Sequence, residues 1–408
     1  MATGETTRDE LLLRGARVVL PDGVADGVAI LVADGLVSRI AREGEANPPA
    51  RQLDLRGASL YPGFIDVHIH GAVGVDALAA APEDLRRVAR FLASRGVTGW
   101  LPTLVPAPDE DYRRAVESIS TLMREQRDEE TSERAAAQRE PSARVLGVHY
   151  EGPFVNAAQC GALRTQYFRA YADASSLEAL AAVKDPRALH MITVAPEIEG
   201  GVALVGELSR RGWVVSVGHT RADLETLDAA RAAGARHMTH FFNAMSPLHH
   251  RAPGVVGWGL VADDVTCDVI ADGVHCDPLV LRLALRCKGA DRLALISDAV
   301  LPAGLGDGDY EVWGETIKVE GGRTRNARGS IAGSVITSLD AARMMLSLGA
   351  RPEEVARMAS LTPARLLGVE RECGSIEEGK RADLVALDGD GRVRLTLVGG
   401  RVAFDAAN

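Results

Sequence analysis

The sequence predicts an α/β protein made of a (β/α)8 TIM-like barrel and a small β-sandwich domain formed from both chain termini. The first observation is that eight short apolar segments alternate with helix-patterned segments over about 250 residues, the usual size of such a barrel. The second is that both ends of the chain instead carry short β-type runs separated by Asp-Gly turns. The third is a length of 408 residues with 46% apolar and 25% charged residues, which is typical of a globular protein with a large core.

The two ends of the chain have the pattern of a small antiparallel sheet. The β-type runs are residues 11–20, 28–32, 36–40, 382–387 and 393–402. Because chain termini commonly lie close together, we expect both sets of runs to join one domain. The predicted division is a β-sandwich domain of residues 1–60 and 376–408 and a barrel domain of residues 61–375.

The middle of the chain supplies the strands and helices of the barrel. The predicted strands are residues 63–68, 97–103, 144–149, 190–195, 213–218, 236–240, 266–271 and 293–297. The predicted helices include residues 82–94, 112–124, 177–183, 201–211, 222–233 and 278–287. A densely charged stretch, residues 125–140, predicts a solvated helix extension or loop between the second and third strands.

Charge and cysteine content disfavour several classes of protein. The net charge of −10 disfavours a nucleic-acid or anionic-membrane surface, because such partners need a concentrated positive field. Five cysteines without paired spacing predict neither a disulfide framework nor a zinc knuckle. No run approaches the roughly 20 apolar residues of a spanning helix, and residues 1–10 lack the pattern of a secretory leader. We therefore expect a cytoplasmic protein with a small-molecule partner.

Polar side chains gather where the predicted strands end, which is where the catalytic residues of such barrels lie. Two histidines at i and i+2 leave the first strand on one face, so both imidazoles can reach one ion. The candidate ligands from five strand ends are His68, His70, Glu151, His219, His240 and Asp298. Neutral imidazoles with carboxylates suit Zn²⁺, which we place first, and also Fe²⁺, Mn²⁺ or Co²⁺. The sequence therefore predicts one or two divalent metal ions per chain.

Ordered blocks around these residues resemble the N-acetylglucosamine-6-phosphate deacetylases of the amidohydrolase superfamily, and the likeness covers nearly the whole chain. The blocks are PGFIDVHIHG (62–71), HYEGPF (149–154), GHT (218–220), THFFNAM (239–245), PGVVG (253–257), DGVH (272–275), SDA (297–299) and IAGS (331–334). The resemblance implies metal-dependent hydrolysis of the N-acetyl amide of an amino sugar phosphate.

The resemblance also implies roles for the candidate ligands. Glu151, His219 and His240 would hold the principal metal, and Asp298 would be the general acid/base that takes a proton from water and delivers it to the departing amine. Family members without the first-strand histidines use one metal, and members that carry them bind two. The presence of His68 and His70 therefore favours two metals with Glu151 as the bridging carboxylate.

A set of substrate contacts follows from the same resemblance. Arg251 is suited to grip a phosphate through two parallel hydrogen bonds. In relatives the arginine at this place reaches across a dimer interface, so a homodimer is implied by resemblance only. The expected substrate-binding residues are Ala162, Asn243, Ala244, Arg251, His275, Ile331, Ala332 and Gly333.

One position departs from the family pattern. Where relatives carry a histidine that contacts the substrate and helps polarise the amide carbonyl, this chain has Leu163. Leucine donates no hydrogen bond, so either a second metal polarises the carbonyl or the substrate differs at this point.

Three hypotheses therefore stand. The first is a deacetylase of N-acetylglucosamine 6-phosphate or a close N-acetyl amino sugar. The second is a related amidohydrolase that deacylates a different N-acyl amino sugar or a specialised metabolite. The third is a non-catalytic sugar-phosphate-binding paralogue, against which the complete set of six candidate ligands argues.

Overall fold

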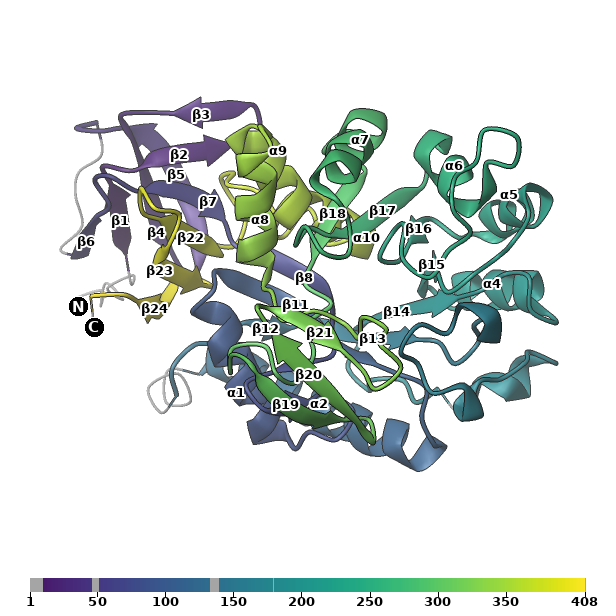
Figure 1. The fold of residues 1–408 in the computed structure, drawn as a ribbon. Coiled ribbons are helices and arrows are strands. Elements are labelled where there is room, and N and C mark those ends of the chain that lie inside the picture. Colours follow the sequence, from purple (N-terminus) through teal and green to yellow (C-terminus); the bar gives the residue numbers. More distant parts are fainter. Residues whose placement is uncertain (1–9, 46–50, 133–138, 179, 408) are drawn as a thin grey trace.

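The computed structural model describes residues 10–45, 51–132, 139–178 and 180–407. Its centre is a barrel of eight parallel strands, with helices on the outside (Figure 1). The barrel strands are β8 (Phe64–Ile69), β11 (Val97–Leu104), β13 (Gly147–Glu151), β14 (Leu189–Val194), β15 (Val214–Val217), β16 (His237–Met238), β17 (Thr266–Ile270) and β18 (Leu293–Ile296). Each coincides with one of the eight predicted segments, which confirms the predicted fold class.

The strands follow one another around the barrel in chain order. Neighbours pair in parallel, with Thr103 opposite His149 and Glu151 opposite Thr193. The ring closes between the last and first strands, where the Asp298 amide donates to the His68 carbonyl at 2.9 Å. The two-residue strand β12 (Arg144–Val145) precedes β13 and also pairs with β11. Parallel pairing in this register brings the carboxyl ends of all eight strands to one rim.

Helices cover the outside of the barrel because each buries an apolar stripe against the strands. In α1, for example, Leu85, Val88 and Leu92 recur at helical spacing and are buried. The helices are α1 (Pro82–Ala93), α2 (Asp109–Thr131), α4 (Gly201–Arg210), α5 (Leu224–Ala233), α6 (Gly254–Val261), α7 (Pro278–Lys288), α8 (Ser338–Ser347), α9 (Pro352–Ala356) and α10 (Thr362–Leu367). A π-helical turn, Arg357–Leu361, joins the last two. Within the described residues, no helix is long and apolar enough to cross a bilayer.

Strands from both ends of the chain form two further sheets beside the barrel. One sheet has the order β5 (Leu36–Arg42), β4 (Val28–Ala33), β1 (Leu11–Arg14) and β6 (Arg51–Asp54). The other has the order β24 (Arg401–Asp405), β23 (Val393–Val398), β22 (Leu384–Leu387), β7 (Ser59–Pro62), β2 (Arg17–Leu20) and β3 (Gly23–Ala25). Figure 1 shows the N-terminal strands in purple beside the C-terminal strands in yellow.

An apolar core fills the space between these two sheets. Leu13, Ile30, Leu60, Leu384 and Leu397 are buried in it together. The core therefore joins residues from the two ends of the chain, as the predicted β-sandwich requires. The exact division into two domains stays a prediction.

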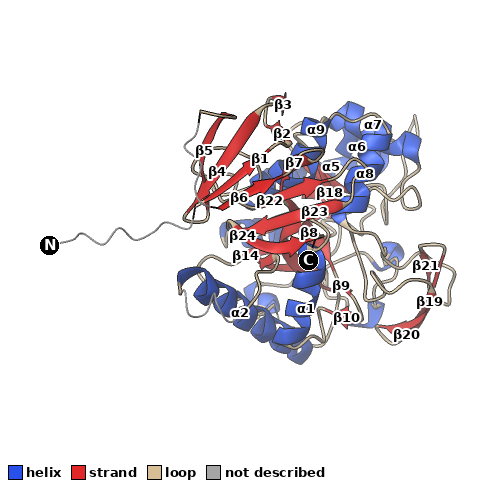
Figure 2. Ribbon diagram, turned by 90° about the vertical axis from the view of Figure 1, so that its left-hand side faces the viewer, coloured by secondary structure: helices blue, strands red, loops and turns tan. Residues whose placement is uncertain are grey.

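Two small hairpins lie beside the barrel strands. The first pairs β9 (Gly71–Ala72) with β10 (Val75–Asp76). The second belongs to an antiparallel sheet of β19 (Gly308–Val312), β20 (Glu315–Glu320) and β21 (Arg323–Arg325), inserted between β18 and α8. Figure 2 shows this sheet on the right-hand side, away from the two terminal sheets.

The predicted helix at residues 177–183 is wrong. A short 3-10 turn, Ala174–Leu177, is present instead, and residues 180–183 are irregular. Their backbone groups find partners outside a helix, because the Ala181 carbonyl accepts the Tyr150 hydroxyl at 2.6 Å and the Val183 amide donates to His190 Nε2 at 3.0 Å.

The charged stretch at residues 125–140 continues α2 as far as Thr131. Glu129 in this extension is buried rather than solvated, and its Oε1 forms an ion pair with Nη2 of the buried Arg86 guanidinium at 2.9 Å. Residues 133–138 of the stretch lie outside the described residues.

Candidate active site

The six candidate ligands lie together at the carboxyl-end rim of the barrel. They form two groups, in each of which the ligand atoms lie within 4.8 Å of one another. One group is His68, His70 and Asp298, and the other is Glu151, His219 and His240. All six residues are buried. Five strand ends far apart in the sequence thus converge on one place.

The backbone turns sharply at three of these residues. The dihedral angle φ is +48° at His219, +32° at His240 and +49° at Asp298. Such left-handed angles are uncommon for residues with a Cβ atom, and they concentrate at functional sites. Each of the three closely follows a barrel strand, so the turn fixes where the side chain leaves the rim.

Glu151 lies between the two groups. Its Oε1 is 3.0 Å from His219 Nε2 and 2.9 Å from His240 Nε2, and its Oε2 is 3.2 Å from His70 Nε2. Asp298 completes the first group, because its Oδ1 is 3.2 Å from His70 Nε2 and 3.4 Å from His68 Nε2. The Glu151 carboxylate is therefore placed to be shared between two cations.

The histidine tautomers fit a metal centre. The Nδ1 atoms of His70 and His219 lie 3.1 Å and 2.7 Å from the carbonyl oxygens of Thr103 and Gln159. A carbonyl only accepts, so each Nδ1 carries a proton, and Nε2 is the ring atom that faces the site and can bind a metal. Nitrogen and carboxylate oxygen are ligands of Zn²⁺ and of several other divalent transition metals.

The charge balance points the same way. Burial alone would raise the pKa of the Glu151 carboxyl, but the surrounding histidines hold it well below its ordinary value. Burial alone would lower the pKa of His70, but hydrogen bonds to Asp298 and Glu151 raise it to about 10. The carboxylates thus stabilise positive charge in a dry place, which is the role that a bound cation takes over.

A second layer of buried side chains supports the ligands. Asp66 Oδ1 accepts the amides of His68 and Ser297, each at 3.3 Å, and thereby ties the first strand to the last. Asp268 accepts the His240 amide and, at 2.8 Å, lies beside His237 Nε2. Neither carboxylate is among the site residues predicted from the sequence. The signal was available, because each is a charged residue inside an apolar strand at the rim.

His149 belongs to this supporting layer and not to the ligand groups. Its Nδ1 donates to the Val67 carbonyl at 3.0 Å, and its Nε2 accepts from the Thr193 hydroxyl at 2.9 Å. Burial lowers the pKa of His149 to about 3, so the ring is neutral. Its edge-on contact with the His68 ring, at 4.7 Å between centroids, helps to fix that ligand.

A cavity of about 160 Å³ opens above the ligands. Most predicted substrate-binding residues line it: Ala162, Asn243, Ala244, His275, Ile331 and Gly333. Ala332 is instead buried in a small apolar cluster with Val312 and Ile317. Arg251 is exposed and is not among the lining residues, and its Nη1 lies 2.9 Å from His250 Nε2. Trp313 and Ile270 line the cavity without having been predicted.

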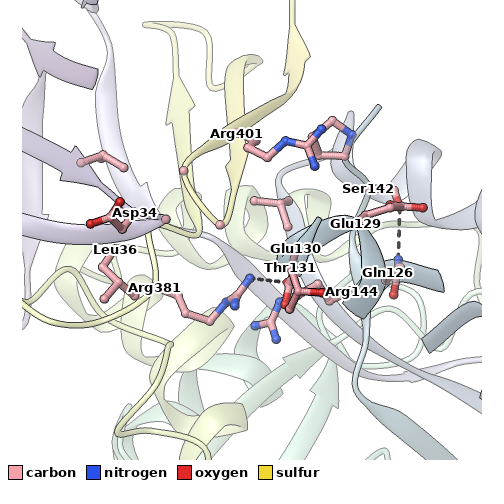
Figure 3. Close-up of a pocket in the computed structure, with 16 residues that line it drawn as sticks. Asp34, Leu36, Gln126, Glu129, Glu130, Thr131, Ser142, Arg144, Arg381 and Arg401 are labelled. Atoms are coloured by element: carbon pink, nitrogen blue, oxygen red, sulfur yellow. Dashed lines mark hydrogen bonds and ion pairs between the residues drawn. The ribbon is translucent and has the colours of Figure 1, made fainter. Parts of the chain in front are cut away.

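A larger cavity, of about 400 Å³, lies between the terminal sheets and α2 (Figure 3). Its charged groups largely neutralise one another, as Arg381 does by donating to Glu130 at 2.7 Å. The two groups of metal-type ligands lie at the smaller cavity. The smaller cavity is therefore the candidate active site.

Comparison with known proteins decides the family. The model of the amidohydrolase family matches residues 59–403, which is most of the chain. The chain belongs to the amidohydrolase family. Amidohydrolases of this kind hydrolyse amide bonds, and the chain is thus a hydrolase, as predicted.

Individual relatives of this amidohydrolase are similar over their full length. The N-acetylgalactosamine-6-phosphate deacetylase of Escherichia coli O157:H7 is 36% identical over 96% of this chain and 99% of its own. The N-acetylglucosamine-6-phosphate deacetylase of Bacillus subtilis (strain 168) is 33% identical over 97% of this chain and 98% of its own. The predicted resemblance to N-acetylglucosamine-6-phosphate deacetylases is confirmed.

Solved structures agree with these relatives. The N-acetylglucosamine-6-phosphate deacetylase of Pasteurella multocida has a TM-score of 0.85 and 29% identity, over 96% of this chain and 99% of its own. A mutant of the Mycobacterium smegmatis deacetylase, in complex with N-acetyl-D-glucosamine-6-phosphate, has a TM-score of 0.85 and 30% identity, over 97% of this chain and 99% of its own.

Proposed function

We propose that this amidohydrolase uses one or two divalent metal ions to remove the acetyl group from an N-acetylated hexosamine 6-phosphate, giving the free amine and acetate. N-acetylglucosamine 6-phosphate is the first candidate. The observation that carries the proposal is the Glu151 carboxylate, which lines a small cavity and lies within 3.2 Å of histidines from both ligand groups. The names of the relatives support the choice of substrate.

Asp298 is the proposed proton carrier. When bound, a divalent cation supplies Lewis-acid activation of water and of the amide carbonyl. Asp298 lines the cavity beside both first-strand histidines, so its carboxylate can take a proton from the attacking water. The same proton then passes to the amine nitrogen as the carbon–nitrogen bond breaks, because an amine anion is a very poor leaving group.

Polar residues of the cavity wall are proposed to orient the sugar. Asn243 lines the cavity and is itself held by the His240 carbonyl, to which its Nδ2 donates at 3.3 Å. The Asp272 carboxylate accepts from His275 Nδ1 at 2.7 Å and so fixes that ring. His275 Nε2 is then the acceptor nitrogen of the ring and can accept a hydrogen bond from a sugar hydroxyl.

The phosphate is proposed to meet a cation from a second subunit. The lining residues of the cavity, within the described part of the chain, include no arginine or lysine. Arg251 lies on an exposed turn outside the cavity of its own chain. A homodimer in which the partner subunit's Arg251 reaches this cavity would complete the site with a charge-assisted, two-point contact.

A second candidate substrate is the C4 epimer, N-acetylgalactosamine 6-phosphate. The relative that is named for that sugar is 36% identical to this chain over nearly its full length. The two candidates share the amide and the phosphate and differ only in the configuration of the hydroxyl group at C4.

One experiment tests both candidates. Purified protein supplemented with Zn²⁺, Fe²⁺, Mn²⁺ or Co²⁺ is assayed for amine release from both epimers, each with and without the 6-phosphate. We expect turnover of at least one phosphorylated epimer, complete loss after chelation and recovery after metal is restored. Unchanged turnover in fully chelated protein would contradict the metal dependence, and no turnover of any of the four sugars would contradict the proposed substrate class.

A further inference from the structure

The tip of the β19–β20 hairpin carries a tryptophan into the candidate active site. The hairpin turn is Trp313-Gly314, flanked by the paired residues Val312 and Glu315. The Trp313 ring meets the His70 imidazole edge-on, with 5.1 Å between ring centroids and 82° between ring planes. Trp313 also lines the cavity, together with Leu163. The proposed reaction steps assign no role to this indole.

The backbone at this turn is unusual for a tryptophan. The dihedral angle φ is +53° at Trp313 and +81° at Gly314. A two-residue hairpin turn with two positive φ angles strongly favours asparagine, aspartate or glycine at its first position. A bulky residue there is strained, and such strain persists only where the surroundings impose it, often at ligand-binding sites. The position of the indole therefore points to a role beyond the turn itself.

The indole is held in place by its surroundings. It packs against a small buried cluster of Val312, Ile317 and Ala332, against which Ala162 also packs. Packing on this cluster and the edge-on contact with the His70 ring hold the indole in place.

The chemistry of the cavity indicates that the indole of Trp313 lies on the side of the cavity that faces the acyl group of the substrate. The amide carbon must lie within reach of Glu151 and Asp298, and His70 Nε2 is 3.2 Å from each of these carboxylates, so the side of the cavity at His70 is where an acyl group can lie. Leu163 and Trp313 are large apolar side chains on the lining, and Trp313 directly contacts His70. Ile331 also lines the cavity but is 39% exposed, so it borders solvent. Apolar side chains suit the methyl group of an acetyl, which makes no hydrogen bond.

We propose that Trp313 and Leu163 form the wall of the acyl pocket and that the indole of Trp313 limits the acyl group to acetyl. This inference rests on the proposed function and adds acyl-chain selectivity to it. The indole lines the side of the cavity at His70, so methylene groups added to an acyl chain on that side would meet its ring. Leu163 then serves as an apolar contact to the acetyl methyl, at the position where the family resemblance led us to expect a histidine.

The test compares acyl chains of different length. N-acetyl, N-propionyl and N-butyryl glucosamine 6-phosphate are assayed with wild type, Trp313→Ala, Trp313→Phe and Tyr310→Ala. Tyr310 is the matched control, because it belongs to the same hairpin and packs on the same cluster but does not line the cavity. We expect Trp313→Ala to raise the ratio of kcat/KM for butyryl over acetyl by at least about 10-fold, Trp313→Phe to raise it less, and Tyr310→Ala to leave it unchanged.

A second measurement needs no turnover. Acetate and butyrate are titrated by calorimetry into zinc-loaded wild type and Trp313→Ala, and we expect the preference for acetate to be lost in the variant. If wild type releases no amine from any of the sugars but this preference still changes, the proposed substrate is wrong and the wall is supported. If wild type is an active deacetylase but neither the kcat/KM ratio nor the carboxylate preference changes, the wall is refuted. An equal rise of the ratio in Tyr310→Ala would also refute it, because loosening of the hairpin would then account for the effect.

Discussion

Asp298 is the residue on which the proposed proton transfers depend. Replacing it with asparagine keeps the shape of the side chain but removes the proton acceptor, so we expect kcat to fall by roughly 10²- to 10⁴-fold. Metal content, measured by elemental analysis, should stay near the wild-type value, because the other five candidate ligands are intact.

Asp309→Asn, on the exposed strand β19, is the matched control and should keep the wild-type rate. A near-wild-type rate for Asp298→Asn would remove this residue from the reaction. If Asp298→Asn loses its metal as well as its activity, the main role of Asp298 is to bind the metal and not to carry the proton.

A substitution of Asp268 tests whether a residue outside the ligand groups fixes the position of the ligand His240. Its carboxylate holds the amide of His240, whose φ of +32° is uncommon for a histidine. Without this acceptor the buried amide is unpaired and the turn can relax, so Asp268→Ala should weaken metal binding about 10- to 100-fold. Competition with a chromogenic chelator measures the change.

Thr266→Val is the control for this experiment. It removes a hydrogen bond of 2.6 Å to His237 Nδ1 but leaves the contact between Asp268 and the His240 amide in place. A comparable loss of affinity in both variants would show that general loosening of the barrel, and not the held amide, is responsible.

At the scale of elements, Asp383 ties the terminal sheets to the barrel. It directly precedes β22, and its Oδ2 accepts from Arg144 at 3.0 Å and from Arg381 at 3.3 Å. Arg381 also donates to Glu130 on α2. Asp383→Asn leaves two partly buried guanidinium groups without their shared carboxylate, and we expect it to lower the free energy of unfolding by about 3 to 5 kcal/mol at pH 7.

The pH dependence of this contribution has a definite sign. Burial alone would raise the pKa of Asp383, but Arg144 and Arg381 hold it below the ordinary value. The stabilisation is therefore full above the pKa of an unfolded aspartate, about 3.9, and is lost as the pH falls through the lower folded value. Urea denaturation from pH 7 downward should show the gap between wild type and Asp383→Asn closing in that acidic range, while Asp390→Asn, an exposed pair with Arg392, changes stability by less than about 0.5 kcal/mol.

The elements also show what a sequence can and cannot predict. The barrel strands were predictable because short apolar runs, each followed by polar residues such as Glu151 and His219, are typical of buried parallel strands. The segment at residues 177–183 has helical spacing but takes its backbone partners from Tyr150 and His190, which only the tertiary structure supplies. The sequence predicts no element between residues 299 and 330. Nothing in the sequence distinguishes Trp313 from a tryptophan that is buried in the core. Its place beside His70 depends on a turn geometry that tryptophan does not favour.

At the scale of the whole molecule, the proposed homodimer makes a sharp prediction about Arg251. Arg251→Ala should raise KM for the phosphorylated sugar, with little effect on the unphosphorylated one, because only the phosphate loses a contact of about 1.5 to 3 kcal/mol. The subunit that supplies the contact is decided by mixing this variant with Asp298→Asn in one dimer.

In a mixed dimer, one site contains an intact Asp298 from its own chain and the partner subunit's Arg251. Activity at low substrate concentration should therefore return toward half of the wild-type value, although each parent homodimer is impaired. No recovery in isolated mixed dimers would place Arg251 in the site of its own chain, and a monomeric protein in solution would contradict the dimer altogether.

The sheet built from both ends of the chain has a consequence for biosynthesis. β7 pairs with β2 on one side and with β22 on the other, and the whole barrel lies between β7 and β22 in the sequence. A ribosome adds roughly 5 to 20 residues per second, so the edge of β7 that pairs with β22 stays unpaired for tens of seconds during synthesis. An open strand edge is a template for pairing with another chain. The nascent protein is therefore most exposed to misassembly while its barrel is being made, and the arrival of β22 ends that interval.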